Sequence, residues 1–421
     1  MKTKAVRLYG KNDLRLEEFQ LPEIAENEIL AKVVSDSLCV SSYKAALQGA
    51  AHKRVPEDVA EHPVIIGHEF CGEIVAVGER WRHRWQKGMR FAIQPGISYK
   101  GSLDAPGYSF PYLGGDATYV VVPSMFMEEE CLLPYDGKAF FYGSLAEPMS
   151  CIAGAFHASY HTRPGSYVHE MGIVEGGNLA ILGGAGAMGL GTVQYALGCG
   201  RRPGLLVVAD IDSARLQRAE ALTPPAKAAE KGVRLVYANL SGLDDPVKAL
   251  LDLTGGRGYD DVFVYAPVRQ AADMGDALLS RDGCLNFFAG PTDPKFSANF
   301  NFYNVHYAGT HVVGTSAGNT ADMREALSMM EQGLLDPAVM ITHVGGLDAV
   351  AEATLRLPEL PGGKKLIYTH ISMPLTAIAE FAALGETDPL FAALHKIVAE
   401  NNGLWCARAE RYLLEHRAGE G

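Results

Sequence analysis

Four side chains in the first third of the sequence have the chemistry of a metal centre. Cys39 precedes His68 by 29 residues, Glu69 follows directly, and Glu147 lies 79 residues beyond His68. Thiolate, imidazole and carboxylate together suit Zn²⁺ with one position left open for water or substrate, as in catalytic zinc sites. These spacings do not identify a metal site by themselves, because a histidine at the end of a strand is more often an ordinary core residue.

A second group of residues has the spacing of a dinucleotide-binding loop. The pattern G-x-G-x-x-G follows an apolar strand and opens a helix, and it comprises Gly184, Gly186, Ala187, Met188 and Gly189. The first glycine allows a tight turn, the second a close approach of the pyrophosphate, and the third close packing of helix on strand. The helix N-terminus favours the phosphate charge. A purely structural glycine turn is the alternative.

An acid at the end of the next apolar strand supports the interpretation of this loop as a dinucleotide-binding site. Asp210 lies 21 residues after Gly189, near the offset of the acid that accepts a hydrogen bond from the adenosine ribose. A carboxylate there repels a 2′-phosphate, so we expect NAD(H) to be preferred over NADP(H). Arg201, Arg202 and Arg215 are close enough in sequence to leave NADP(H) open, and a surface role for Asp210 is the alternative.

The elements that must position these residues change in kind near residue 178. Before it, short β runs separated by Gly and Pro predict a mostly-β, barrel-like domain. After it, apolar strands alternate with helical segments, which predicts a doubly wound parallel sheet of the Rossmann type and an α/β protein. The early β runs are 31–34, 64–66, 73–77 and 117–122, the later strands 179–182, 205–209, 233–237, 261–265, 284–288 and 311–314, and the helices 187–197, 213–222, 244–253 and 270–279.

The chain after residue 315 is predicted to return to the first domain, through a helix at 320–331 and a strand at 365–368. The last segment is amphipathic and helical, and packing or a subunit contact is its expected role. We therefore expect three parts: a catalytic domain of residues 1–155 completed by 315–369, a dinucleotide-binding domain of 156–314, and a helical C-terminal extension of 370–421.

Composition narrows the class of protein further. The chain has 421 residues and a formal net charge of −12, which disfavours binding to nucleic acid or to an anionic membrane. It has no run of about 18 apolar residues and no signal peptide at its start. Seven scattered cysteines without a C-x-x-C pair fit a reducing compartment, so we expect a cytoplasmic protein.

These motifs together resemble one family. Gly67-His-Glu-x-x-Gly72, Cys39 followed by hydroxyl residues, Glu147-Pro148 and a later Rossmann fingerprint are similar to the zinc-dependent medium-chain alcohol and polyol dehydrogenases. The similarity covers residues 1 to about 369. Within the family the chain is most similar to the bacterial L-sorbose-1-phosphate reductases, through the segments 5–11, 106–111, 284–291 and 314–320.

The resemblance implies a GroES-like catalytic domain joined to a Rossmann domain, with Cys39 and His68 as zinc ligands. It implies that Glu69 or Glu147 supplies the third protein ligand, with exchange between the two or action through water left open. Ser41 stands where the family's proton relay begins. The family's glycine after the zinc cysteine and its histidine five residues after it are replaced here by Val40 and Lys44.

One zinc per subunit is expected rather than two. The family often holds a second, structural zinc on four closely spaced cysteines, but the corresponding segment 94–116 has no cysteine. The resemblance further implies a homodimer or homotetramer.

The expected function is zinc-dependent hydride transfer between NAD(H) and a ketose or polyol phosphate, with L-sorbose 1-phosphate reduced to D-glucitol 6-phosphate. An unphosphorylated polyol or secondary alcohol is the alternative substrate. A remote alternative is that the protein binds a nucleotide without catalysing a reaction. A sugar phosphate needs a local cluster of donors on an acidic chain, and the run from Lys44 to Arg54 is the densest near the ligands. Lys44 is open to three interpretations: phosphate binding, the outer proton relay, or a solvated surface charge.

Overall fold

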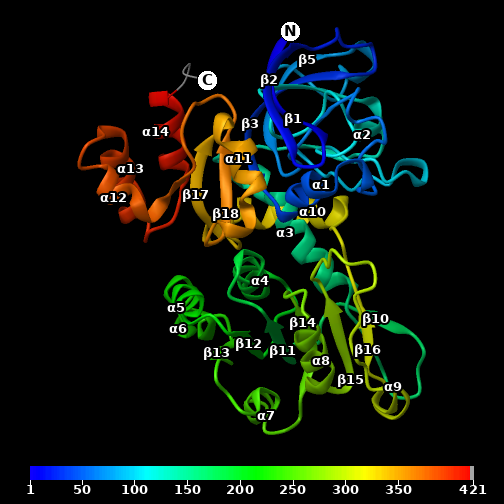
Figure 1. Ribbon diagram of the computed structural model, residues 1–421. Coiled ribbons are helices and arrows are strands. Elements are labelled where there is room, and N and C mark those ends of the chain that lie inside the picture. Colours follow the sequence, from blue (N-terminus) through cyan, green and yellow to red (C-terminus); the bar gives the residue numbers. More distant parts are fainter. Residues whose placement is uncertain (418–421) are drawn as a thin grey trace. The chain divides into compact units, whose positions relative to one another are not determined.

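The computed structural model describes residues 1–417, and these form two compact units. The first unit contains Met1–Glu147, Asn319–Glu331 and the chain from Ile341 onward, and the second contains Pro148–Gly318 and Gln332–Met340. Helix α3 (Phe140–Ala158) begins in the first unit and ends in the second (Figure 1). Among the helices of residues 1–417, none combines the length and hydropathy that a membrane crossing requires.

The first unit is built around an eight-stranded sheet in which segments from both ends of the chain pair. The strand order is β19-β17-β18-β3-β5-β6-β8, with β7 also paired to β3, and a second sheet has the order β2-β1-β4. The strands are β1 (Lys2–Gly10), β2 (Asp13–Gln20), β3 (Ile29–Leu38), β4 (Val64–Ile65), β5 (Cys71–Val77), β6 (Arg90–Ile93), β7 (Tyr119–Val122), β8 (Leu132–Pro134), β17 (Ile341–Gly346), β18 (Lys364–Tyr368) and β19 (Thr376–Ala377).

Strand β3 passes from the hydrophobic core at its start to a group of buried polar side chains at its end. Its first residues alternate between buried and half-buried positions, as expected of a strand with one face on a core, whereas its last six residues are all buried. Three of those six, Ser35, Asp36 and Ser37, are polar. Buried polar side chains need partners, so this end of β3 must face other polar groups.

The second unit has the predicted doubly wound fold. All neighbouring strands of its six-stranded sheet are parallel, in the order β13-β12-β11-β14-β15-β16. The strands are β11 (Asn178–Leu182), β12 (Leu205–Asp210), β13 (Arg234–Asn239), β14 (Tyr259–Val264), β15 (Leu279–Phe287) and β16 (His311–Val313), beside a hairpin of β9 (Tyr160–Thr162) and β10 (His169–Met171). The helices are α4 (Ala187–Gly198), α5 (Ser213–Leu222), α6 (Pro225–Ala229), α7 (Pro246–Asp252), α8 (Arg269–Leu278) and α9 (Phe302–Ala308). The predicted fold class is confirmed.

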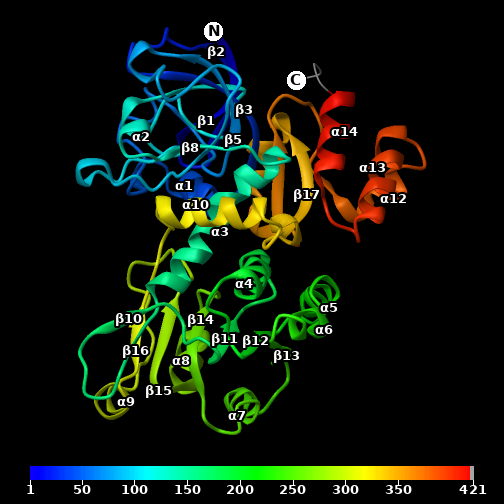
Figure 2. The same ribbon diagram turned by 180° about the vertical axis from the view of Figure 1, so that it is seen from behind.

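The C-terminal segment packs on the first unit as a small helical layer. Figures 1 and 2 both show α12, α13 and α14 together beside β17. The segment is not wholly helical, because β19 pairs with β17 and extends the main sheet. The helices of this unit are α1 (Val40–Gln48), α2 (Ser124–Glu128), α10 (Thr320–Glu331), α11 (Val350–Leu355), α12 (Phe381–Leu384), α13 (Pro389–Glu400) and α14 (Ala407–Arg417).

A buried carboxylate fastens α14 to the start of α3. The side chain of Glu410 is 3% exposed, and it accepts hydrogen bonds from the backbone N–H groups of Phe140 (2.6 Å) and Phe141 (2.9 Å) and from the Tyr368 hydroxyl (2.8 Å). Trp405 donates in turn to that hydroxyl at 2.9 Å. Glu410 therefore caps α3 from a distant part of the chain, at the end where a negative charge is favoured.

Glu410→Ala should accordingly destabilise the protein by about 2–4 kcal/mol, because it leaves two buried N–H groups and a buried hydroxyl without an acceptor. Urea unfolding followed by circular dichroism measures the effect. Glu415→Ala, on the exposed side of the same helix, is the matched control and should change stability by less than about 0.5 kcal/mol. Equal effects of the two substitutions would contradict the capping role.

Candidate active site

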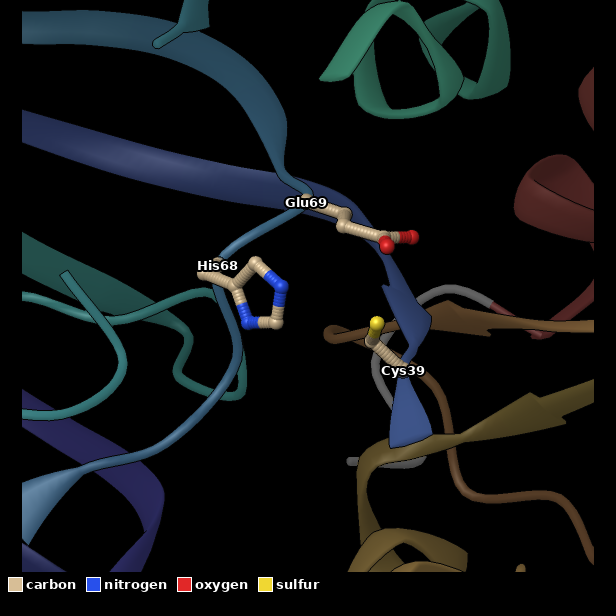
Figure 3. A group of neighbouring side chains, drawn as sticks. All are labelled: Cys39, His68 and Glu69. Atoms are coloured by element: carbon tan, nitrogen blue, oxygen red, sulfur yellow. The ribbon is translucent and has the colours of Figure 1, made fainter. Parts of the chain in front are cut away.

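The residues predicted to bind metal come together at the junction of β3 and β5. One ligand atom from each of Cys39, His68 and Glu69 lies within 4.8 Å of the others, and Figure 3 shows the three side chains converging. Cys39 follows β3 and caps the N-terminal end of α1, while His68 and Glu69 precede β5. Because β3 and β5 pair antiparallel, the end of one strand meets the start of the other.

The donor atoms of this group fit zinc. His68 is buried, and burial lowers its pKa, so its imidazole is neutral, as metal binding requires. Its Nδ1 lies 3.4 Å from the Ser42 hydroxyl, which leaves Nε2 available. Burial raises the pKa of the Cys39 thiol, and the Lys364 charge opposes that rise. A thiol, a neutral imidazole and a carboxylate form a mixed donor set that suits Zn²⁺.

Glu69 is held by a lysine that the sequence analysis did not single out. Lys364 Nζ lies 2.5 and 2.6 Å from the two carboxylate oxygens, and Ser37 also donates to one of them. Burial alone would raise the pKa of Glu69, but attraction to Lys364 and hydrogen bonds from Lys364 and Ser37 bring it below its ordinary value. Burial opposes the charge of Lys364 as well, and Glu69 and Cys39 raise its pKa. Glu69 is therefore an ionised, oriented carboxylate.

Glu147 belongs to the same site but has a different environment. It lies on α3, is 7% exposed, and is not one of the three groups within 4.8 Å. Burial, with repulsion from Glu69, raises its pKa to about 7. The two acids that the sequence left as alternatives thus differ in charge: Glu69 is ionised by its partner, while Glu147 titrates near neutrality.

Two further buried acids pack against the backbone of the segment that carries His68 and Glu69. Asp36 accepts a hydrogen bond from the Glu69 backbone N–H at 3.0 Å, and burial with repulsion from Asp116 raises the pKa of Asp36 well above its usual range. Burial also raises the pKa of Asp116 to about 7. Gly67 precedes the ligands with φ +87°, and a Cβ there would meet Asp116 N at 2.6 Å. Only glycine fits between this acid pair and His68.

An aromatic side chain covers His68 on another side. Tyr108 is 2% exposed, and its ring centroid lies 5.1 Å from that of His68. Burial raises its pKa, and a hydrogen bond with Ser41 opposes that rise. Ser41 Oγ is also 3.5 Å from Cys39 Sγ. Lys44 is on the same helix, three residues later, and burial lowers its pKa against the attraction of Cys39. The structure thus places Ser41 beside the metal group, with Lys44 one turn further along the same helix.

The predicted dinucleotide loop joins β11 to α4 in the second unit. A Cβ on Gly189 would come within 1.9 Å of the Gly184 carbonyl oxygen, whereas a Cβ on Gly186 would meet no atom within 4 Å. In the described part of the chain, no side chain caps the N-terminus of α4, whose first residues are Ala187 and Met188. The N-terminus of α4 therefore faces an open cradle at Gly186, which fits a pyrophosphate.

Asp210 lies at the carboxyl end of β12 and is tied to this loop. It accepts hydrogen bonds from the backbone N–H groups of Ala185 (3.0 Å) and Ile211 (2.8 Å). Arg215 Nε lies 3.3 Å from Asp212, so its charge already has a partner. Arg201 and Arg202 precede β12 and lie at the opposite, amino edge of the parallel sheet. Of the three arginines, Arg215 alone is on the cofactor side.

A GroES-like unit with a thiol–imidazole–carboxylate group, followed by a Rossmann unit with an open glycine cradle, defines a zinc-dependent dehydrogenase. Residues 25–129 match the alcohol dehydrogenase GroES-like domain family and residues 187–332 the zinc-binding dehydrogenase family. L-sorbose 1-phosphate reductase of Klebsiella pneumoniae is 51% identical over 414 residues, 98% of both chains. Mannitol-1-phosphate 5-dehydrogenase of Aliivibrio fischeri is 52% identical over 413 residues, 98% of this chain and 97% of that protein.

The chain therefore belongs to the zinc-binding, GroES-like alcohol dehydrogenase family, which confirms the resemblance drawn from its motifs. It is an oxidoreductase that uses zinc and a nicotinamide cofactor. The fold agrees with the crystal structure of 2R,3R-butanediol dehydrogenase from Bacillus subtilis, with a TM-score of 0.70 and 22% identity over 87% of this chain and 99% of that one.

Proposed function

We propose that the protein interconverts a ketose phosphate and a polyol phosphate with NAD(H), and that reduction of L-sorbose 1-phosphate to D-glucitol 6-phosphate is its reaction. The observation that carries this is the Cys39–His68–Glu69 group in a chain that is 51–52% identical, over nearly its full length, to two sugar-phosphate oxidoreductases. The small cysteine-free segment 94–116 supports a single catalytic zinc.

Cys39 and His68 would hold the metal, with Glu69 or Glu147 as the third protein ligand. When bound, Zn²⁺ supplies Lewis acidity toward a carbonyl or alcohol oxygen. A bound nicotinamide would supply the hydride that reduces the carbonyl carbon, and the protein must then provide a proton for the oxygen. Burial raises the pKa of Glu147, which favours its protonated form, and with Glu69 as the ligand Glu147 would remain to hold that proton, while Lys364 keeps Glu69 ionised.

A hydroxyl path supports the proton's exchange with solvent. Ser41 lies beside both Cys39 and Tyr108, and Lys44 follows at i+3 on α1, on the same face of the helix. We propose that in reduction Lys44 donates the proton and Ser41 Oγ passes it inward to the substrate oxygen, and that oxidation uses the same path outward; Lys44 stands in the place where the family has a histidine. Burial lowers the pKa of Lys44, which helps it release a proton.

A substrate panel tests the proposed reaction. Zinc-loaded protein with NADH should reduce L-sorbose 1-phosphate with a kcat/KM about 100-fold above that for L-sorbose, since charged hydrogen bonds to a phosphate contribute about 1.5–3 kcal/mol each. D-fructose 6-phosphate tests the second relative's type of substrate. A kcat/KM for an unphosphorylated sugar or simple alcohol that equals or exceeds that for both phosphates would refute the proposal.

The cofactor preference follows from Asp210. We expect NADH to be preferred over NADPH, and Asp210→Asn to reduce the ratio of their kcat/KM values about tenfold, the equivalent of ~1.4 kcal/mol of charge repulsion. Steady-state kinetics with both cofactors measures the ratio. Asp244→Asn, an exposed acid after the next strand, should leave it unchanged. A higher kcat/KM with NADPH in the wild type would instead assign the 2′-phosphate to Arg215.

We propose a cytoplasmic homo-oligomer whose subunits join through the β16 edge of the second unit. Support comes from α9, which has no buried residue, and from the edge of β16 beside it, which pairs with no further strand among residues 1–417. Large apolar side chains are exposed there: Tyr167, Val168, Met171, Phe302, Tyr303, Tyr307 and Val312. An exposed apolar patch at a sheet edge is a typical site for pairing with a second copy of the chain. Light scattering should give a dimer or tetramer of the 45.3 kDa chain, and a monomer would refute this.

A further inference from the structure

An arginine without an acidic partner lies near the metal group. Arg54 is half-buried, and its Nε is buried without a hydrogen-bond acceptor among residues 1–417. Within the same residues, no carboxylate lies within 4.0 Å of its guanidinium. A partly buried cation without a counter-charge is costly unless an anion completes its surroundings. Arg54 therefore has the properties of a binding residue rather than of a structural ion pair.

Its backbone and side chain are both fixed. The Ser109 hydroxyl donates to the Arg54 carbonyl oxygen at 2.7 Å, and the Arg54 N–H donates to His52 Nδ1 at 3.3 Å. The guanidinium carbon lies 5.4 Å from the centroid of the Tyr108 ring, a cation–π distance. A guanidinium held in this way loses little freedom when it binds an anion.

Tyr108 also sets the distance between Arg54 and the metal group. The same ring that carries the guanidinium lies 5.1 Å from the His68 ring, so the cation is at most two such spacings from a metal ligand. That separation is comparable with the length of a hexose phosphate. The His52 ring also stacks on Tyr108, with 5.4 Å between the ring centroids, and so helps to hold the Tyr108 ring in place.

The local charge is positive although the chain's net charge is −12. Burial, with repulsion from Arg54, Lys53 and Lys44, lowers the pKa of His52 to about 4, so these three cations lie close enough to act on the same place. A concentrated positive field of this kind favours an anion with nearly two charges.

We propose that Arg54, supported by Tyr108, binds the phosphate group of the substrate while the reacting carbon lies at the Cys39–His68–Glu69 group. This inference rests on the proposed function and assigns the phosphate to Arg54, with Lys44 left to the proton path. The planar guanidinium can donate two parallel hydrogen bonds to phosphate oxygens, which an ammonium cannot do.

Arg54→Gln in the zinc-loaded enzyme tests the assignment. KM for L-sorbose 1-phosphate should rise about 10- to 100-fold, as expected for the loss of charged hydrogen bonds, while KM for unphosphorylated L-sorbose should stay the same. Arg54→Lys should recover part of the loss, because it keeps the charge and loses the second hydrogen bond. Lys87→Gln removes an equal charge from an exposed position outside the site and should change neither KM by more than about threefold.

Inorganic phosphate provides a second probe that does not depend on the sugar. It should inhibit the wild type competitively against the sugar and inhibit Arg54→Gln at least tenfold less, with thermal melting confirming that both are folded. Equal losses for phosphorylated and unphosphorylated sugar, or equal inhibition of both proteins by phosphate, would overturn the inference. If the wild type reduces only unphosphorylated sugars, the proposed function fails, and phosphate inhibition alone then decides whether Arg54 forms an anion site.

Discussion

Cys39→Ser is expected to remove the bound zinc and to lower kcat/KM for the ketose phosphate by a factor of at least about 10³, the equivalent of several kcal/mol of lost Lewis-acid stabilisation. A serine hydroxyl does not replace a thiolate as a zinc ligand. The remaining imidazole and carboxylate of the group, at His68 and Glu69, offer too few donors to retain the metal.

Elemental analysis and cofactor binding separate this effect from general damage. The wild type should contain one zinc per subunit and the variant close to none, while NADH binding measured by fluorescence should persist, because the glycine loop belongs to the other compact unit. Cys406→Ser, at a half-buried position outside the site, should leave zinc and activity unchanged. Full zinc content in Cys39→Ser would contradict the ligand assignment, and two equivalents in the wild type would contradict a single zinc.

The second unit could be predicted from sequence because its signals are local. Each strand and the helix that follows it occupy one continuous stretch, and the glycine pattern lies between β11 and α4, where its function requires it. Asp210 could be found in the same way, at the end of β12. The three backbone N–H groups that hold its carboxylate, at Ala185, Ile211 and Asp212, add a structural role that spacing alone could not show.

The metal group was only partly predictable. Cys39 and His68 are brought together by the pairing of β3 with β5, and a spacing of 29 residues does not encode that contact, so the resemblance to a family was needed. Lys364 was missed because it is 295 residues from Glu69 and reaches it through the pairing of β18 with β3. Its signal was a pair of lysines at the start of an apolar strand, where surface charges are not expected.

Helix α3 was also missed, since Pro148 lies inside it and proline ordinarily ends a helix. Tertiary contacts outweigh that preference here. Gly143 allows the helix to approach Cys71, where a Cβ would lie 2.3 Å from the sulfur, and Glu410 caps the first turn from the far end of the chain. Neither contact can be predicted from local sequence, yet α3 is the element that brings Glu147 to the site.

Lys364→Met is expected to destabilise the zinc-free protein by about 3–5 kcal/mol, because it leaves the carboxylate of Glu69 buried without a cation. The lysine is 7% exposed and the glutamate 1%, so water cannot replace the lost partner. The pKa of Glu69 in the folded variant should rise above its value in the unfolded chain. The loss of stability should therefore shrink as the pH falls and Glu69 becomes protonated.

Two companion variants make this measurement specific to the ion pair. Lys365→Met changes the neighbouring buried lysine, which donates to the backbone carbonyls of Pro361 and Gly363 at 2.7 Å. Because these carbonyl acceptors do not titrate, the loss of their hydrogen bonds should not depend on pH. The double variant Lys364→Met/Glu69→Gln removes the unpaired charge and should be more stable than Lys364→Met alone, which a double-mutant cycle in urea quantifies. A double variant that is as unstable as the sum of the single ones would mean that Lys364 and Glu69 act independently, and that another group holds the carboxylate at the metal site.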